Sequence, residues 1–144
     1  MDHLAIMNPK RKLIPKILSG GKTIESRWYM MKVAPWDKIK AWDTVYFKDA
    51  GKMVTASAMV AKVLQYDHYT DVQLQDILKN YWWPWWIAFH SPLDEVYHWA
   101  KPKHYCLLIF LKDPKKIIPF AIDKRWYGMM VSWITLSDIN KIKL

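Results

Sequence analysis

The order of strand-like and helix-like segments most constrains what this chain can fold into. Runs of strand-type residues and apolar positions at helical spacing predict several strands with helices inserted between them. This order favours the α+β class, with a mixed, small, barrel-like sheet and flanking helices. A length of 144 residues suits one domain over residues 1–144. We expect strands at residues 4–7, 22–28, 44–48, 53–65, 104–112, 117–122 and 133–136, and helices at 10–18, 70–81 and 91–100.

Capping and turn residues indicate where some of these segments begin and end. Thr70 and Gln73 have the spacing of a capping box, so the second helix is expected to start at Thr70. Asp113 followed by Pro114 predicts a turn, because proline lacks the N–H that a central strand needs. The two late strands are therefore expected to be separate.

The chain is basic and rich in tryptophan. Lys and Arg number 22 against 13 acids, which gives a formal charge of +9, and there are 10 Trp. The excess positive charge lies in residues 1–48 and 101–144, whereas residues 66–100 are net acidic. A small, basic, aromatic-rich domain points first to a polyanionic partner, of which nucleic acid is the common case.

The cysteine count and the hydropathy pattern exclude several classes of protein. A single cysteine, Cys106, can form neither an internal disulfide nor a thiolate metal cluster, so a reducing, cytoplasmic setting is expected. No apolar run approaches the roughly 20 residues that a membrane-spanning helix needs. The histidines lack tight ligand spacing, and no phosphate-binding glycine loop is present, so no metal and no cofactor are predicted.

The segment after the first expected helix gathers charged residues on a strand. Thr23, Glu25 and Arg27 would share one strand face, and Lys22 would lie on the other unless the turn at residues 20–21 swings it round. A lysine, a carboxylate and an arginine converging on one cleft can bind a phosphate or a nucleobase edge. They can also perform acid–base chemistry, with Lys22 and Glu25 as the candidate catalytic pair. An ordinary ion pair between Glu25 and Arg27 is the structural alternative.

This segment resembles the signature of the ASCH (ASC-1 homology) domain family, which lies within the PUA-like superfamily. The signature is G-x-K-x-x-E-x-R, and Gly20, Lys22, Glu25 and Arg27 fill its places. The resemblance extends to the segments at residues 3–6, 41–48, 105–111 and 133–134, which match strands of the family. It implies a PUA-like β-barrel whose cleft binds RNA, another single-stranded nucleic acid or a nucleoside.

Two branches of the family imply enzymes. One resembles an amidohydrolase of acylated cytidine, with a lysine at Lys22, a threonine at the place of Glu25, and a glutamate from a later strand. Here Glu25 replaces that threonine, Thr23 is two residues away, and the other glutamate, Glu95, falls in an expected helix. The other branch resembles a ribonuclease acting on single-stranded RNA.

Further candidates lie outside this segment. Lys48, at the end of an expected strand, and Lys124, Arg125 and Trp126 combine cations with an aromatic ring, which suits phosphate contact and base stacking. A dense aromatic cluster in the acidic middle could pack inside the protein or meet a protein partner; it comprises Trp82, Trp83, Trp85 and Trp86. Three hypotheses remain open: a nucleic-acid-binding module, a hydrolase of the same fold, and a protein-interaction domain.

Overall fold

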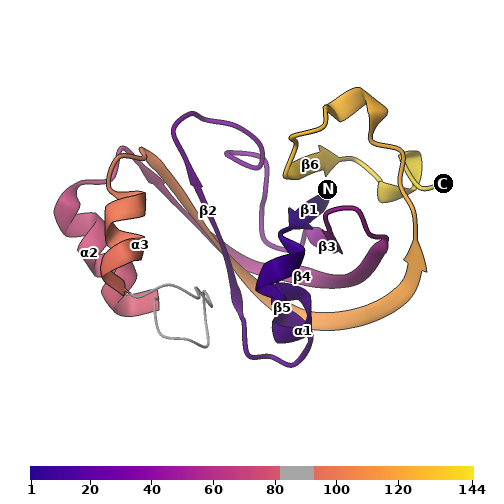
Figure 1. Ribbon diagram of the computed structural model, residues 1–144, viewed down its shortest axis with the longest axis horizontal. Helices are drawn as coiled ribbons and strands as arrows, with labels where there is room; N and C mark the ends of the chain where they lie inside the picture. Colours follow the sequence, from indigo (N-terminus) through magenta and orange to yellow (C-terminus); the bar gives the residue numbers. More distant parts are fainter. Residues whose placement is uncertain (82–92) are drawn as a thin grey trace.

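The computed structural model describes residues 1–81 and 93–144 and is built around one curled sheet (Figure 1). The sheet has six strands in the order β2-β5-β4-β3-β1-β6. β1 and β3 run parallel and the other neighbours run antiparallel, so the sheet is mixed, as predicted. The strands are β1 (Asp2–Met7), β2 (Ile24–Tyr29), β3 (Thr44–Asp49), β4 (Val54–Asp67), β5 (Tyr105–Phe120) and β6 (Trp133–Leu136). The helices are α1 (Leu13–Leu18), α2 (Asp71–Tyr81) and α3 (Leu93–Ala100), with short 3-10 turns η1 (Pro9–Arg11), η2 (Arg125–Tyr127) and η3 (Ile139–Lys141).

The sheet curls into a half-barrel whose edges are β2 and β6 (Figure 1). Within the described residues, no backbone ladder joins these two edges. β6 is only 4 residues long and its pairing is taken up by β1. The α+β class and the mixed sheet are therefore confirmed, while the hydrogen-bonded strand order leaves the half-barrel open between β2 and β6.

The long strands β4 and β5 form the main body of the sheet. The predicted interruption of β5 at Asp113 and Pro114 is wrong, because β5 runs through both residues as one strand of 16 residues. The register against β4 shifts between Lys112 and Lys115, and Asp113 adopts a φ of 51°. This irregularity lets the strand bend and accommodates a proline that cannot donate to the ladder.

Helices α2 and α3 lie beside the far end of β4 and β5, away from β1 and β6 (Figure 1). The predicted capping box starts α2: the Thr70 N–H donates to Gln73 Oε1 at 2.8 Å, and the Gln73 N–H donates to Thr70 Oγ1 at 3.1 Å. The two helices bury an apolar face against the outer side of β2 and β5. That face packs Leu74, Ile77, Leu78, Val96 and Ala100 against Ile24, Trp28, Cys106 and Leu108.

The other face of the sheet carries the main core. Helix α1 packs there against β3 and β5, through Leu13, Ile14 and Ile17. The next strand, β2, therefore has helices α2 and α3 on one side and the concave core on the other. This placement puts alternate β2 side chains in two different environments.

Candidate functional site

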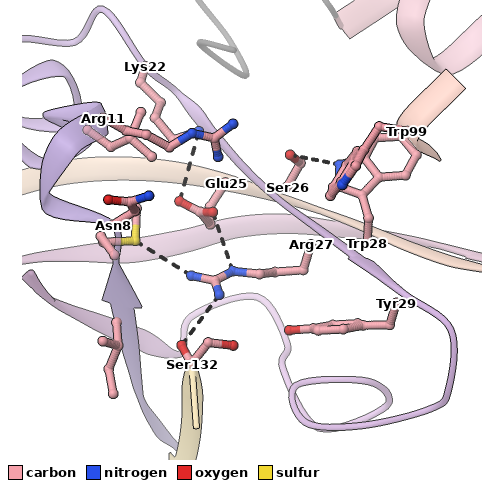
Figure 2. A pocket seen from close by; sticks show the side chains of 13 residues that line it. Asn8, Arg11, Lys22, Glu25, Ser26, Arg27, Trp28, Tyr29, Trp99 and Ser132 are labelled. Atoms are coloured by element: carbon pink, nitrogen blue, oxygen red, sulfur yellow. Dashed lines mark hydrogen bonds and ion pairs between the residues drawn. The ribbon is translucent and has the colours of Figure 1, made fainter. Parts of the chain in front are cut away.

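A pocket of about 290 Å³ lies where the half-barrel is open. Its walls come from the end of β1 and the turn after it, from β2, and from Ser132 just before β6 (Figure 2). The charged side chains of the sequence motif, Lys22, Glu25 and Arg27, all line it, together with Arg11. The structure thus brings together three of the residues that the sequence singled out.

Lys22 reaches the pocket because of the turn between α1 and β2. Gly20 adopts a φ of +80°, a conformation that other residues rarely take, and the Lys22 N–H then donates to the Lys16 carbonyl at 3.0 Å. Lys22 Nζ donates to the Ile24 carbonyl at 2.7 Å and lies 3.9 Å from Glu25 Oε2. The turn therefore overrides strand alternation, and the lysine, with 2% of its surface exposed, joins Glu25.

Glu25 is the centre of the charge cluster. It is 4% exposed, and its Oε1 lies 3.4 Å from Arg27 Nε in an ion pair (Figure 2). Among the described residues, Glu25 Oε2, Arg27 Nε and the Tyr29 hydroxyl are buried without a hydrogen-bond partner. Buried polar atoms in native proteins are nearly always hydrogen-bonded, so the acceptor capacity of Glu25 Oε2 is available to a polar ligand in this pocket.

Arg27 spans the opening between the two sheet edges. Its Nη1 donates to the Ser132 carbonyl at 3.4 Å, and its Nη2 lies 3.5 Å from Met7 Sδ. The guanidinium also lies over the Trp133 ring, 5.0 Å from its centroid. β2 and β6 are thus linked by a side chain where no backbone ladder joins them in the described part of the chain.

Burial and neighbouring charges shift the acid–base behaviour of the pocket. Burial lowers the pKa of Lys22 from its ordinary value of 10.5 to about 8; Glu25 opposes this fall, and Arg27 and Arg11 add to it. Burial raises the pKa of Tyr29, and the adjacent Arg27 guanidinium opposes that rise. The lysine therefore changes its charge at a far lower pH than a surface lysine does.

Comparison with solved structures identifies the architecture. The crystal structure of ASCH from Zymomonas mobilis matches with a TM-score of 0.63 and 18% identity, over 94% of this chain and 87% of that one. Crystal structures of two single-residue variants of the same protein match with TM-scores of 0.66 and 0.67 and identities of 18% and 17%. They cover 97% of this chain and 93% and 91% of theirs.

This chain has the ASCH fold. No protein-family model and no curated protein sequence matches it, so the likeness is one of three-dimensional structure. Within the ASCH fold described here, the residues Gly20, Lys22, Glu25 and Arg27 lie on the turn and the edge strand beside the open side of the half-barrel.

An aromatic wall completes the pocket of this ASCH fold. Trp28 and Trp99, from β2 and α3, pack edge to face with ring centroids 6.2 Å apart, and the Trp28 N–H donates to Ser26 Oγ at 3.1 Å. Trp99 remains 47% exposed. Sequence reasoning missed Trp99 and Ser132, because both come from distant segments and neither stands in a recognisable motif.

Other predicted site residues lie outside this pocket. Thr23 is exposed, and its carbonyl accepts the Leu111 N–H at 2.9 Å. Lys48 is buried on β3 near Lys124, and both burial and Lys124 lower the pKa of Lys48. Lys48 and Lys124 therefore form a basic pair outside the pocket.

The segment around η2 also departs from the expected arrangement. Arg125 makes a close ion pair with Asp123, with Nη2 2.6 Å from Oδ2, and both residues line a different hollow. Trp126 is 89% exposed and does not line the pocket. Arg125 and Trp126, predicted to contact nucleic acid, therefore do not line the pocket beside Lys22; Arg125 is instead paired with Asp123 in its own turn. The cluster of Trp82, Trp83, Trp85 and Trp86 lies outside the described residues.

The described residues contain neither a cluster of metal-binding side chains nor a helix that could span a membrane. No group of three or more His, Cys, Asp or Glu side chains is placed to hold a metal ion in residues 1–81 and 93–144. Glu95 lies on a helix, α3, as predicted; it is exposed there and does not line the pocket. None of the described helices has the length and apolar character needed to span a membrane.

Proposed function

We propose that this ASCH-type domain binds RNA or another single-stranded nucleic acid, with a nucleotide seated beside Lys22, Glu25 and Arg27. The observation that carries the proposal is a pocket holding a buried lysine, a half-buried arginine and a buried carboxylate with unused hydrogen-bonding capacity. Its volume of about 290 Å³ lies at the lower end of the roughly 300–1,000 Å³ usual for ligand pockets. That size favours one nucleoside rather than a longer segment.

Each pocket residue has a chemical role in this proposal. Glu25 Oε2 accepts an exocyclic amino group of a base, because a carboxylate only accepts hydrogen bonds. Lys22 and Arg27 neutralise a phosphate or donate to base acceptors. Trp99 offers an exposed aromatic face for base stacking, beside the Lys103 ammonium 4.8 Å from its ring centroid.

The basic pair of Lys48 and Lys124 attracts the nucleic-acid backbone next to the pocket. Lys48 pairs in register with Ile6 on the neighbouring strand, and Ile6 lines the pocket. The Ile6 N–H in turn donates to the Ser132 carbonyl, which also accepts from Arg27. A chain leaving the pocket at this edge therefore meets the second pair of cations.

The remaining predicted contacts have smaller roles. Gly20 shapes the turn that places Lys22 in the pocket, and Thr23 lies exposed just before β2. Arg125 contacts a phosphate when it leaves Asp123, and Trp126 presents an exposed ring beside it. A cytoplasmic location, a single domain and a protein partner at the tryptophan cluster belong to the same proposal.

Binding measured against salt tests this function. Fluorescence anisotropy with a labelled single-stranded RNA should give an affinity that falls with rising salt, by a log–log slope of about 0.7 per phosphate contacted. Arg27→Gln and Lys22→Met should weaken binding, and Lys38→Met, at an exposed lysine away from the pocket, is the matched control. An affinity that does not change with salt contradicts the phosphate contacts.

A hydrolase of the same fold is the second candidate. The observation that favours it is the lowered pKa of Lys22, about 8, because a lysine that loses its proton near neutral pH can act as a general base. The amidohydrolase arrangement lacks its late-strand glutamate among the described pocket residues, so a ribonuclease fits better. RNA turnover lost in both Lys22→Ala and Glu25→Ala would favour the enzyme. Absent turnover in wild type, together with salt-dependent binding, would favour the binding module.

A further inference from the structure

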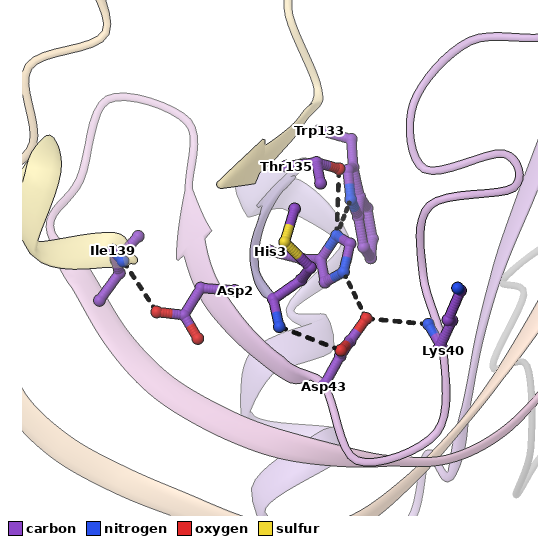
Figure 3. A network of polar contacts seen from close by, with 8 residues as sticks. Asp2, His3, Lys40, Asp43, Trp133, Thr135 and Ile139 are labelled. Carbon is purple, nitrogen blue, oxygen red and sulfur yellow. Dashed lines mark hydrogen bonds and ion pairs between the residues drawn. The ribbon is translucent and has the colours of Figure 1, made fainter. Parts of the chain in front are cut away.

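A buried polar network joins the first strand, β1, to the start of β6 (Figure 3). Its centre is His3 on β1, which is fully buried. His3 Nε2 lies 3.0 Å from Asp43 Oδ2, and Nδ1 lies 3.1 Å from both Trp133 Nε1 and Thr135 Oγ1. Nothing in the sequence motif involves these residues, and His3 does not line the pocket.

The hydrogen-bonding chemistry of the network determines the protonation state of His3. An indole N–H can only donate, so Nδ1 must accept from Trp133 and carries no proton. The proton therefore sits on Nε2 and is donated to Asp43, which also accepts the Lys40 N–H at 2.9 Å. Burial lowers the pKa of His3 and Asp43 opposes this fall, which agrees with a neutral ring.

Trp133 connects this network to Arg27 in the pocket. Its ring is buried, its N–H is held by His3, and its face lies 5.0 Å from the centre of the Arg27 guanidinium. The preceding residue, Ser132, offers its carbonyl to the same guanidinium. Two groups at the start of β6 therefore contact Arg27: the Trp133 ring and the Ser132 carbonyl. His3 in turn accepts the hydrogen bond of the Trp133 indole.

We propose that His3 is a positioning residue for the pocket, acting through its hydrogen bond to the Trp133 indole to hold Arg27 in place for an anionic ligand. The inference rests on the proposed function for its ligand, but the geometry of Arg27 can be tested without one. Without the acceptor at Nδ1, the indole N–H is left unpaired and the ring is free to turn. Arg27 then loses the flat surface over which it lies.

The direct test is the NMR resonance of the Arg27 Nε–H, which the ring current of Trp133 should displace. His3→Leu removes the acceptor, and we expect the displaced signal to move toward that of an ordinary arginine. His3→Asn keeps an amide oxygen close to the place of Nδ1, so the displacement should be retained. Trp133→Phe replaces the indole and should remove most of the displacement, which shows that Trp133 causes it. His3→Phe, which also lacks an acceptor for the indole N–H, takes the place of His3→Leu if that variant does not fold.

A double-mutant cycle on RNA affinity tests the functional consequence. His3→Leu should weaken binding of a short single-stranded RNA about tenfold, comparable to the loss of one hydrogen bond. The same change should have almost no effect in the Arg27→Gln background, because a residue acting only through Arg27 has nothing left to position. Rescue of affinity by His3→Asn is also expected.

Different results would overturn the positioning role of His3 and the proposed RNA binding. An Arg27 signal that is unchanged in His3→Leu, or an equal loss of affinity in the wild-type and Arg27→Gln backgrounds, overturns the positioning role. Wild-type protein that binds no RNA overturns the proposed function alone, since the Arg27 resonance still decides whether His3 positions it.

Discussion

Replacing Lys22 by methionine should stabilise this protein at neutral pH. Lys22 is almost completely buried, and its ammonium must fold into a place where Arg27 and Arg11 also lie. Methionine is unbranched and apolar and can occupy much of the same space without a charge. The substitution therefore removes the desolvation cost of the ammonium and leaves Glu25 its ion pair with Arg27.

The magnitude follows from the pKa of Lys22. A fall from 10.5 to about 8 corresponds to about 3 kcal/mol, because one pKa unit is worth about 1.4 kcal/mol. Below pH 8 the lysine is protonated in both the folded and unfolded chains, and the whole cost is present. Between pH 8 and 10.5 the folded chain loses this proton while the unfolded chain keeps it, so stability rises with pH. Over that range, the free energy of unfolding of wild type should therefore rise relative to that of Lys22→Met by up to about 3 kcal/mol.

Urea denaturation at a series of pH values between 7 and 10.5 measures this difference. We expect the free energies of unfolding of wild type and Lys22→Met to converge as the pH rises through 8. Other titrating groups affect both proteins and cancel in the difference, and Lys38→Met, at an exposed site, should keep a constant offset from wild type. Parallel pH curves for wild type and Lys22→Met would refute the conclusion that burial depresses the pKa of this lysine.

Three further results are expected. Trp99→Ala should weaken RNA binding by about 1–3 kcal/mol through lost base stacking, with little change in the urea midpoint because the ring is half-exposed; unchanged anisotropy titrations would exclude the stacking role. Thr70→Ala should lower the free energy of unfolding by about 1 kcal/mol through loss of the α2 cap, and a larger loss of binding than of stability would contradict a purely structural cap. Lys124→Ala should leave mononucleotide affinity unchanged and reduce the salt slope for a longer strand by about 0.7, so an equal loss for both ligands would place Lys124 in the pocket.

The open edge of the sheet explains why the site could be only partly predicted. Strand alternation correctly placed Glu25 and Arg27 on one face of β2, opposite Trp28, because side chains alternate wherever a strand is regular. The position of Lys22 depended on the Gly20 turn, whose path the sequence left open. Ser132 could not be foreseen at all, since it meets Arg27 across 105 positions of the chain.

The sequence by itself determined the elements whose signals are local. The capping box of α2, the turn glycine before Lys22 and the apolar run of β6 are each specified by a few neighbouring residues, and each appears where it was predicted. Only the tertiary structure decided the rest. Asp113 and Pro114 stay within one strand because the register against β4 shifts there, and the segment around Arg125 lines a hollow other than the Lys22 pocket. One contact network includes His3, Trp133 and Arg27, because β1, β6 and β2 come together at the opening of the half-barrel. These residues are far apart in the chain, so no local sequence pattern predicts their contacts.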